Sequence, residues 1–440
     1  MHIAVIGGGL MGMTLAYFLS EAGQRVTVLE QGSAIGGLHN PAQLADNLSI
    51  PRYPHNIHPG DKHIFKLINQ LGLQDEVCRR HAPSGLVHHG DIYPLRSIWD
   101  FLTFRPLRLR DRLRLGQTIL QARLTNDWHT LDQIPVRDWL IKIGGKSNFE
   151  RVWAPLLEAK FDYDYDDVPA TFIWSWLNRA STLRGGPDLH TSLVYLRRGP
   201  GALVEAMADA IRARGNEIRV QTRVREIEIH DNQIGQLRTY SGILDFDMVA
   251  AAIPTPELSH LLLTADETYR QSLSKAPYLG LICPALVVDQ PASEYWTLNL
   301  TDPSSPFSSI VTLPHPDNAQ YHVMYLPKYT APENDWMGVP DSDILEAWMI
   351  RLRQVYPNLK PEHIKHAVVN RTRYVDPLHA LNAKERIPAV QTPYEGLYLA
   401  NTSQVYPELP TSEAVIAHAQ RVARQLLAQP VRHTLSSTAA

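Results

Sequence analysis

Three glycines near the N-terminus have the spacing of a phosphate-binding turn. Gly7, Gly9 and Gly12 follow an apolar run at 2–6, and a stretch with helical character follows at 11–22. In a βαβ unit the first glycine permits a tight turn, the second lets a pyrophosphate approach the backbone, and the third allows close packing of helix on strand. The free amides at the start of the helix then face the phosphates. This spacing predicts a dinucleotide site.

An acidic residue ends the second predicted strand of the same unit. Glu30 closes the apolar run at 26–30, about 20 residues after the glycines, where a carboxylate accepts hydrogen bonds from a ribose hydroxyl. A tight turn without a ligand would not explain the spaced glycines and this acid together. A second glycine turn, Gly36–Gly37, follows closely.

Composition limits the class of protein. The chain has 440 residues, of which 44% are hydrophobic, and this length is enough for two or three domains. A net charge of −3 gives no general attraction to nucleic acid. Cys78 and Cys283 are the only cysteines, so neither a disulfide framework nor a metal-ligand pattern is present. No stretch of 18 apolar residues and no signal peptide is found, and we expect a cytoplasmic protein.

Hydrophobic periodicity predicts that one nucleotide-binding domain is assembled from separate parts of the chain. Expected helices are 11–22, 61–71, 203–215 and 413–427, with mostly helical structure over 96–150. Expected strands or β-rich runs are 2–6, 26–30, 217–230, 235–246, 248–253, 280–288, 320–326 and 396–401. The fold class predicted is α/β: a discontinuous Rossmann-like domain with an inserted α+β substrate domain of helices and sheet.

The boundaries expected for these domains follow from the same pattern. The nucleotide-binding domain is predicted at 1–95, 196–265 and 371–429. The substrate domain is predicted at 96–195 and 266–370, and the Ser/Thr/Ala-rich tail at 430–440 is expected to be disordered.

At this point the chain resembles the FAD-dependent amine oxidase superfamily, in its protoporphyrinogen oxidase-like and phytoene desaturase-like branch, with similarity to UDP-galactopyranose mutase. The resemblance rests on three blocks: Gly7 to Gly37, Arg198 to Val224, and Gly396 to Leu427. It implies non-covalent FAD, with Val224 beside the adenine and the start of the last helix facing the flavin.

Two positions depart from the pattern of that family. Leu38–His39 stands where members usually carry arginine, and Ala400–Asn401 stands where many carry Gly-Asp. Asn401 can still hydrogen-bond a phosphate or a ribityl hydroxyl, but it brings no charge. The cofactor-binding residues predicted from the motif and the resemblance together are Gly7, Gly9, Leu10, Met11, Gly12, Glu30, Gln31, Gly36, Gly37, Leu38, His55, Val224, Ala252, Asn401, Ser412, Glu413 and Ala414.

A loop rich in histidine and proline at 52–61 is similar to a segment of the mutase that lies against the flavin. The resemblance places His55 at the flavin, where an imidazole could hydrogen-bond the ring or an anion and titrate near neutral pH. His58 has a weaker claim to the same role. The alternative is a polar loop with exposed histidines.

The segment 151–161 also looks family-like, and it belongs to the predicted substrate domain. Lys160, if buried, could act as a base or bind a carboxylate, whereas a surface helix with ordinary charges would explain it equally well. Tyr325, Lys328 and Tyr329 could line the substrate side of the flavin, although alternating aromatics are more often core. The predicted catalytic residues are His55, Lys160 and Tyr329. The run at 162–167 is expected to be a solvated loop, and no metal site is expected.

A basic segment at 99–116 interleaves apolar residues with arginines. One interpretation is an amphipathic segment on a membrane surface, or one that grips an anionic substrate. The other is a solvated helix whose arginines cap carbonyls and pair with acids such as Asp111. The arginines are Arg105, Arg108, Arg110, Arg112 and Arg114.

The function predicted is an FAD-dependent oxidoreductase in which hydride leaves a C–H or N–H bond of a small-molecule substrate for flavin N5. The first alternative is a redox-neutral sugar-nucleotide mutase with arginines that clamp a diphosphate. The others are a flavin-binding protein without turnover and an NAD(P) dehydrogenase, which would need a second glycine fingerprint. No nucleic-acid partner is expected, and the sequence leaves the substrate and the oligomeric state open.

Overall fold

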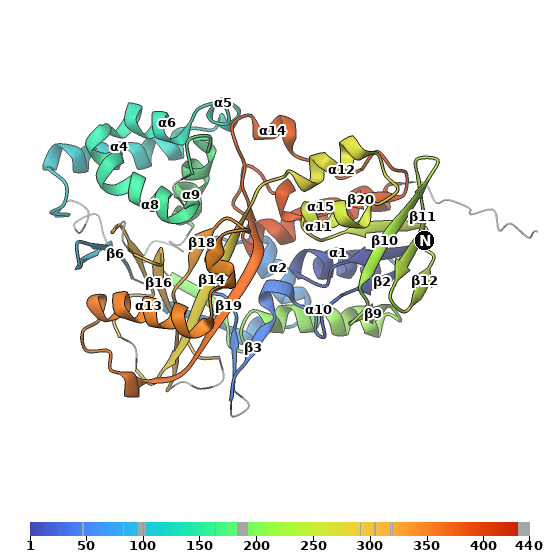
Figure 1. The fold of residues 1–440 in the computed structure, drawn as a ribbon, viewed down its shortest axis with the longest axis horizontal. Coiled ribbons are helices and arrows are strands. Elements are labelled where there is room, and N and C mark those ends of the chain that lie inside the picture. The colour runs from blue at the N-terminus through green and yellow to red at the C-terminus, as the bar shows by residue number, and fades with distance from the viewer. Residues whose placement is uncertain are drawn as a thin grey trace, which may run out of the picture.

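The protein is described by a computed structural model of residues 1–45, 48–81, 83–95, 100, 103–162, 164–182, 192–290, 292–302, 305–316, 318 and 320–429. The predicted tail and residues 96–99, 101 and 102 of the basic segment lie outside these residues. Two sheets occupy opposite ends of the molecule, and a group of helices stands beside the second sheet (Figure 1). No helix among the described residues is long and apolar enough to cross a membrane.

The first sheet is parallel and five-stranded, in the order β20-β13-β1-β2-β9. Its strands are β1 (His2–Ile6), β2 (Arg25–Leu29), β9 (Glu217–Arg219), β13 (Met248–Ala251) and β20 (Leu397–Leu399). Alternate side chains of β1 enter different cores: Ile3 and Val5 pack with helices, whereas Ala4 and Ile6 face the opposite side. Burial on both faces explains why these strands read as continuous apolar runs in the sequence.

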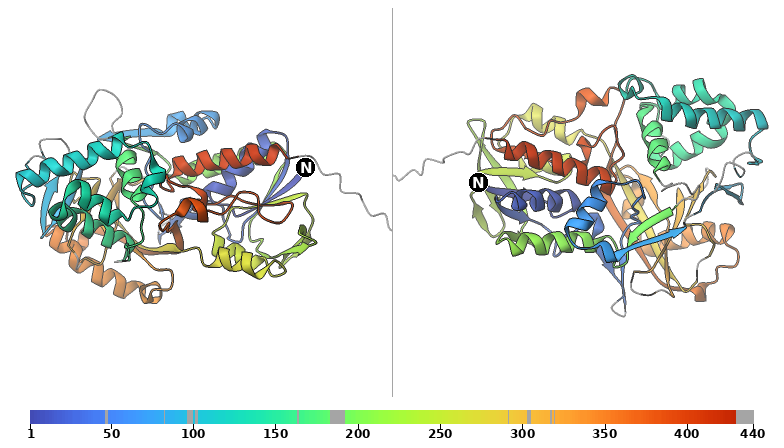
Figure 2. Two further views of the ribbon diagram at one scale, coloured as in Figure 1. Left: turned by 90° about the horizontal axis from the view of Figure 1, so that it is seen from above. Right: turned by 180° about the vertical axis from the view of Figure 1, so that it is seen from behind.

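Three helices cover one face of the parallel sheet. These are α1 (Leu10–Glu21), α10 (Gly201–Ala213) and α15 (Ser412–Leu427). Seen from behind, they lie side by side with α1 between the other two (Figure 2). The antiparallel strands β10 (Val224–His230), β11 (Gln233–Thr239) and β12 (Gly242–Leu244) cover the other face with α11 (Thr255–Leu261) and α12 (Glu267–Ser274).

The second sheet has eight strands, and a helical module packs beside it. Its strands are β6 (Ser84–His88), β7 (Asp91–Pro94), β14 (Tyr278–Val288), β15 (Thr297–Leu300), β16 (Ser309–Pro314), β17 (His322–Tyr325), β18 (Lys328–Thr330) and β19 (Ile364–Pro377). Helix α13 (Asp341–Val355) covers one face through the fully buried Trp348. The module comprises α4 (Leu109–Leu124), α5 (Trp128–Leu131), α6 (Val136–Gly144), α7 (Lys146–Asn148), the π-helical turn Phe149–Trp153, α8 (Ala154–Phe161) and α9 (Thr171–Ser181).

Shorter elements connect these parts. They are β3 (Pro41–Gln43), β4 (Ser49–Pro51), β5 (Val77–His81), β8 (Ser192–Leu196), α2 (His63–Gln70), α14 (Ala383–Arg386) and the 3-10 turns Gly37–His39, Gln74–Glu76, Asp335–Gly338, Pro361–His363 and Thr402–Gln404.

Strand pairing moves two of the predicted domain boundaries. Strands β6 and β7 lie inside the segment 1–95, yet β6 pairs with β15 of the second sheet. Strand β19 extends through Pro377 and pairs along most of β14, so the first residues of 371–429 also belong to that sheet. We keep the two-domain division as a proposal, with the boundaries moved to about 83 and 377.

Candidate cofactor and substrate site

The glycine turn connects β1 to an uncapped helix. Gly9 is the N-cap of α1 and offers no side-chain cap, and the first turn carries no acid. The Gly8 amide donates to Glu30 Oε2 over 2.7 Å, and the Gly36 amide donates to the Gly8 carbonyl over 2.8 Å. The two glycine turns predicted from the sequence are therefore in direct contact, and the first amides of α1, including those of Leu10 and Met11, lack intrahelical acceptors.

A Cβ built at each glycine shows whether neighbouring atoms or open space lie beside it. At Gly12 it would stand 2.0 Å from the Gly7 carbonyl oxygen, and at Gly37 it would stand 3.1 Å from the Gly9 Cα. At Gly9 it would meet nothing nearer than the Gly37 Cα at 4.0 Å. Open space thus lies beside the uncapped start of α1, and a pyrophosphate fits there.

A cavity of about 150 Å³ lies at the carboxyl ends of β1 and β2. Its lining includes Gly7, Glu30, Gln31 and Val224, four residues that the sequence predicts to bind the cofactor. Glu30 Oε1 accepts from the Gly32 amide over 2.6 Å, and each carboxylate oxygen keeps a lone pair for a ribose hydroxyl. Ala252 packs on the turn, with its carbonyl oxygen 2.8 Å from a Cβ built at Gly7.

The residues predicted at the flavin end gather near the start of α15. Ser412 Oγ lies 3.2 Å from Nε2 of His39, which follows Leu38 in the turn Gly37–His39. Thr411 caps α15 by accepting from the Ala414 amide over 3.4 Å. This capped turn therefore stands beside the second glycine turn, as a flavin contact would require.

Two side chains predicted to contact the cofactor form hydrogen bonds within the protein. Glu413 accepts from the amides of Lys62, His63 and Ile64 at 2.8–2.9 Å and so caps α2, leaving only its backbone to face a cofactor. Asn401 Nδ2 donates to the Ile253 carbonyl over 2.9 Å, and its Oδ1 accepts from Ser403. One Nδ2 hydrogen of Asn401 remains for a ligand.

The two histidines of the loop have different surroundings. His55 packs 4.0 Å from the His39 ring, centroid to centroid, and its Nδ1 donates to the Tyr53 carbonyl over 3.0 Å. Burial lowers the pKa of His55 to about 4, so the imidazole is neutral rather than titrating near pH 7. His58 Nδ1 instead lies 2.8 Å from Thr182 Oγ1, at the end of α9, and acts in packing.

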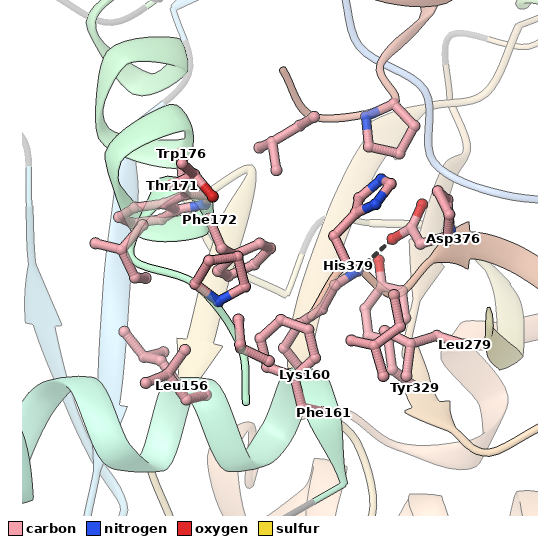
Figure 3. A pocket seen from close by; sticks show the side chains of 18 of the residues that line it. Leu156, Lys160, Phe161, Thr171, Phe172, Trp176, Leu279, Tyr329, Asp376 and His379 are labelled. Atoms are coloured by element: carbon pink, nitrogen blue, oxygen red, sulfur yellow. Dashed lines mark hydrogen bonds and ion pairs between the residues drawn. The ribbon is translucent and has the colours of Figure 1, made fainter. Parts of the chain in front are cut away.

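A larger cavity of about 380 Å³ lies between the helical module and the second sheet. Figure 3 shows Thr171, Phe172 and Trp176 on one side of it, with Tyr329, Leu279 and Asp376 facing them. The apolar part of the wall includes Trp153, Leu156, Leu157, Phe161, Phe172, Ile173, Trp176, Leu279 and Leu378. Residues 406–411, which precede α15, also line it, so this cavity adjoins the predicted flavin edge.

Lys160 and Tyr329 meet in this wall, whereas His55 lies elsewhere. Lys160 Nζ forms an ion pair with Asp376 and stands 3.4 Å above the centre of the Tyr329 ring (Figure 3). Burial opposes the charged form of Lys160, but the attraction and hydrogen bonding of Asp376 and Tyr329 together outweigh it and raise the pKa. A raised pKa keeps the amine protonated at neutral pH, which disfavours a base role for Lys160, and its predicted catalytic role stays a prediction.

His379 is a candidate site residue that the sequence did not suggest. It lines the large cavity, and its Nε2 is buried without a hydrogen-bond partner among the described residues. Its ring centroid lies 4.7 Å from that of Tyr406, with the two rings tilted, and burial lowers the pKa of His379 to about 4. A neutral imidazole with a free nitrogen is suited to hydrogen-bond a ligand. A single histidine after Pro377–Leu378 carries no sequence motif that could have identified it.

The remaining predicted positions have partners within the protein. Tyr325 is fully buried and donates to the Pro51 carbonyl over 2.8 Å. Lys328 pairs with Asp162 at 3.5 Å, and Thr330 donates to the same carboxylate over 2.7 Å. Within the part of the chain that the structure describes, no group of acids, histidines or cysteines could hold a metal ion.

Comparisons with known proteins identify the family. A model of the flavin containing amine oxidoreductases matches residues 10–427. The chain belongs to this family. It is therefore an FAD-dependent oxidoreductase, and the predicted resemblance is confirmed.

Relatives and solved structures extend over most of the chain. A 15-cis-phytoene desaturase from Synechococcus elongatus is 22% identical over 392 residues, covering 81% of this chain and 80% of that protein. An oxidoreductase from Methanosarcina mazei superposes with a TM-score of 0.75 at 17% identity, over 96% and 100% of the two chains. A reduced UDP-galactopyranose mutase gives 0.74 at 13% identity, over 97% and 94%. These two structures are similar in fold.

Proposed function

We propose that this oxidoreductase removes hydride from a C–H or N–H bond of a largely apolar small molecule held in the 380 Å³ cavity. The observation that carries the proposal is the wall itself, which is mostly aromatic and aliphatic, with its charges confined largely to one corner. A cavity of this size and lining suits a drug-sized apolar ligand. Bound FAD supplies the hydride acceptor.

The chain's own residues orient the substrate. Lys160 and Asp376 neutralise each other, and Tyr329 is a neutral phenol because burial and the charge of Asp376 outweigh the opposing effect of Lys160 and raise its pKa. His379 Nε2 is then one polar atom available to bind a hydroxyl, carbonyl or amine of the substrate. Trp153 Nε1, also buried without a partner among the described residues, offers a second donor.

The mutase alternative is disfavoured by the charges of the cavity. A diphosphate clamp needs two or more cations, with bidentate arginines preferred. Among the described residues that line the cavity Lys160 is the one cation, and Asp376 already pairs with it. The likeness to the mutase therefore concerns the fold.

Anaerobic reduction of the FAD-loaded protein tests the proposal. We expect an apolar polyene to bleach the flavin absorbance and a short polar diamine to leave it unchanged. Replacing Leu156→Trp, at a half-buried position of the wall, should slow bleaching at least about tenfold while FAD stays bound, because the larger ring fills the cavity. Ile350→Trp, on the exposed face of α13, is the matched control. Ring contraction of UDP-galactopyranose by the reduced protein would contradict the proposal.

A further inference from the structure

Helix α4 exposes an uncovered stripe of leucines. Leu109, Leu113, Leu120 and Leu124 are 61%, 60%, 57% and 70% exposed. At 3.6 residues per turn they fall within about 60° of arc and extend over about 22 Å. The opposite face, with Leu115, Thr118 and Ala122, is buried against α6 and α9. The stripe therefore faces outward from the helical module, at the end of the molecule opposite the N-terminus (Figure 1).

Arginines flank the stripe on both sides. The helical angles place Arg112 and Arg123 along one edge and Arg110 and Arg114 along the other. Arg110 and Arg123 are exposed, and neither forms an ion pair within the described part of the chain. The only acid of α4, Asp111, is buried and accepts from Ser147 Oγ over 2.9 Å.

This arrangement corrects the simpler interpretation of the basic segment. A solvated helix would turn its leucines inward and pair its arginines with acids such as Asp111. Arg112 does cap a carbonyl, since its Nε donates to Leu107 over 2.8 Å. The leucines are exposed, however, and Asp111 is bonded elsewhere, so ordinary packing and pairing do not account for this face.

We propose that the leucine stripe of α4 docks on the surface of an anionic lipid bilayer. An interfacial helix buries its apolar face among the acyl chains and places flanking arginines among the headgroup phosphates. Each arginine near an anionic surface strengthens binding, and the attraction falls within a Debye length. The leucine stripe and its flanking cations match both layers of such a surface.

A second copy of the chain fits this face less well. In a twofold contact the same stripe meets itself, so the flanking arginines of both copies are brought together. Like charges across an interface oppose association. A dimer through α4 would need acids that the helix does not present.

Docking through α4 would bring the substrate cavity close to lipid. Helix α4 packs against α9, and α9 supplies Thr171, Phe172 and Trp176 to the cavity wall. An apolar substrate dissolved in the bilayer would then have a short path to the site. The docking proposal does not depend on the proposed function, because vesicle binding is measured without turnover.

Co-sedimentation of the FAD-loaded protein with vesicles tests the proposal. We expect binding to vesicles of phosphatidylglycerol with phosphatidylcholine, and much weaker binding to phosphatidylcholine alone. Leu113→Glu/Leu120→Glu should lower the vesicle partition coefficient at least about tenfold, because two leucines no longer insert and two acids face the phosphates. Arg110→Gln/Arg123→Gln should lower it on anionic vesicles and flatten its salt dependence.

A matched double variant controls for added charge. Leu263→Glu/Ile350→Glu introduces the same two acids at residues that are 54% and 59% exposed and lie outside α4. It should change the partition coefficient less than about twofold. An unchanged flavin spectrum shows that each variant is folded. The proposal would be overturned by an equal loss of vesicle binding in both double variants that introduce glutamate, or by no binding to anionic vesicles at low salt. It would also be overturned if the protein formed a dimer that Leu113→Glu/Leu120→Glu dissociates.

Discussion

Asp376→Asn should destabilise the protein because it leaves the charge of Lys160 without an ion-pair partner. The two side chains are 23% and 20% exposed, so the pair is neither fully buried nor on the surface. Exposed pairs contribute about 0.2–1 kcal/mol, and breaking a fully buried pair costs about 3–5 kcal/mol. With partial solvent screening we expect a loss of about 2 kcal/mol in the free energy of unfolding. Asp289→Asn, which breaks the more exposed Lys365–Asp289 pair, should cost less than about 1 kcal/mol.

The pH dependence of this loss has a definite sign. In the wild type the pKa of Lys160 is raised above its unfolded value of about 10.4, so its stabilisation is complete below that pH and is lost as pH rises through the folded pKa. In Asp376→Asn burial acts without the acid and lowers the pKa. The unfolded chain then binds the extra proton, so stability should rise with pH up to about 10.

Urea unfolding of the FAD-loaded variants between about pH 6 and pH 10 measures the loss of stability in Asp376→Asn and its dependence on pH. Lys160→Met/Asp376→Asn should recover part of the stability lost in Asp376→Asn, because neither charge remains unpaired. The reasoning is refuted if Asp376→Asn costs no more than Asp289→Asn, or if its stability falls with rising pH in this range.

Four further substitutions test the site. Gly9→Val should leave the protein folded yet abolish FAD binding, since the φ of Gly9 is −74° and a Cβ there meets open space. Gly12→Ala should instead abolish folding, because its Cβ would stand 2.0 Å from the Gly7 carbonyl oxygen. Flavin absorbance and circular dichroism separate the two outcomes, and retention of FAD by Gly9→Val would contradict the prediction. Glu413→Gln should cost about 1–2 kcal/mol in urea unfolding by weakening the cap of α2, with an unchanged flavin spectrum. His379→Leu should raise KM about tenfold for a substrate with a polar group without lowering stability, and a lower unfolding midpoint would argue that its Nε2 is bonded in the folded protein.

The cofactor half was predictable because its information is local. The turn that includes Gly9 and Gly12, the acid at Glu30 and the Thr411 cap of α15 are each set by a few neighbouring residues. Parallel strands buried on both faces are recognisable as short apolar runs. Even here the sequence could not reveal that Glu413 caps α2, because the two elements lie 350 residues apart.

The substrate half was less predictable because its contacts join distant parts of the chain. Lys160 and Asp376 are 216 residues apart, and no spacing rule relates them. His379 gains its role from burial and a missing partner, neither of which a sequence pattern shows. The proposed shift of the boundary at 95 rests on a distant pairing of the same kind, because β6 pairs with β15 and β7 pairs with β6.

The cofactor half and the substrate half also differ in how much a similar fold implies about function. The predicted cofactor side depends on backbone geometry at Gly7, Gly9 and Gly37, and such a glycine turn is shared by many dinucleotide-binding proteins. The substrate side depends on side-chain charge, and here the Lys160–Asp376 pair leaves the wall close to neutral. A mutase and a desaturase can therefore share the first half while their substrates differ in charge. In this chain the near-neutral wall favours an apolar substrate over a sugar nucleotide.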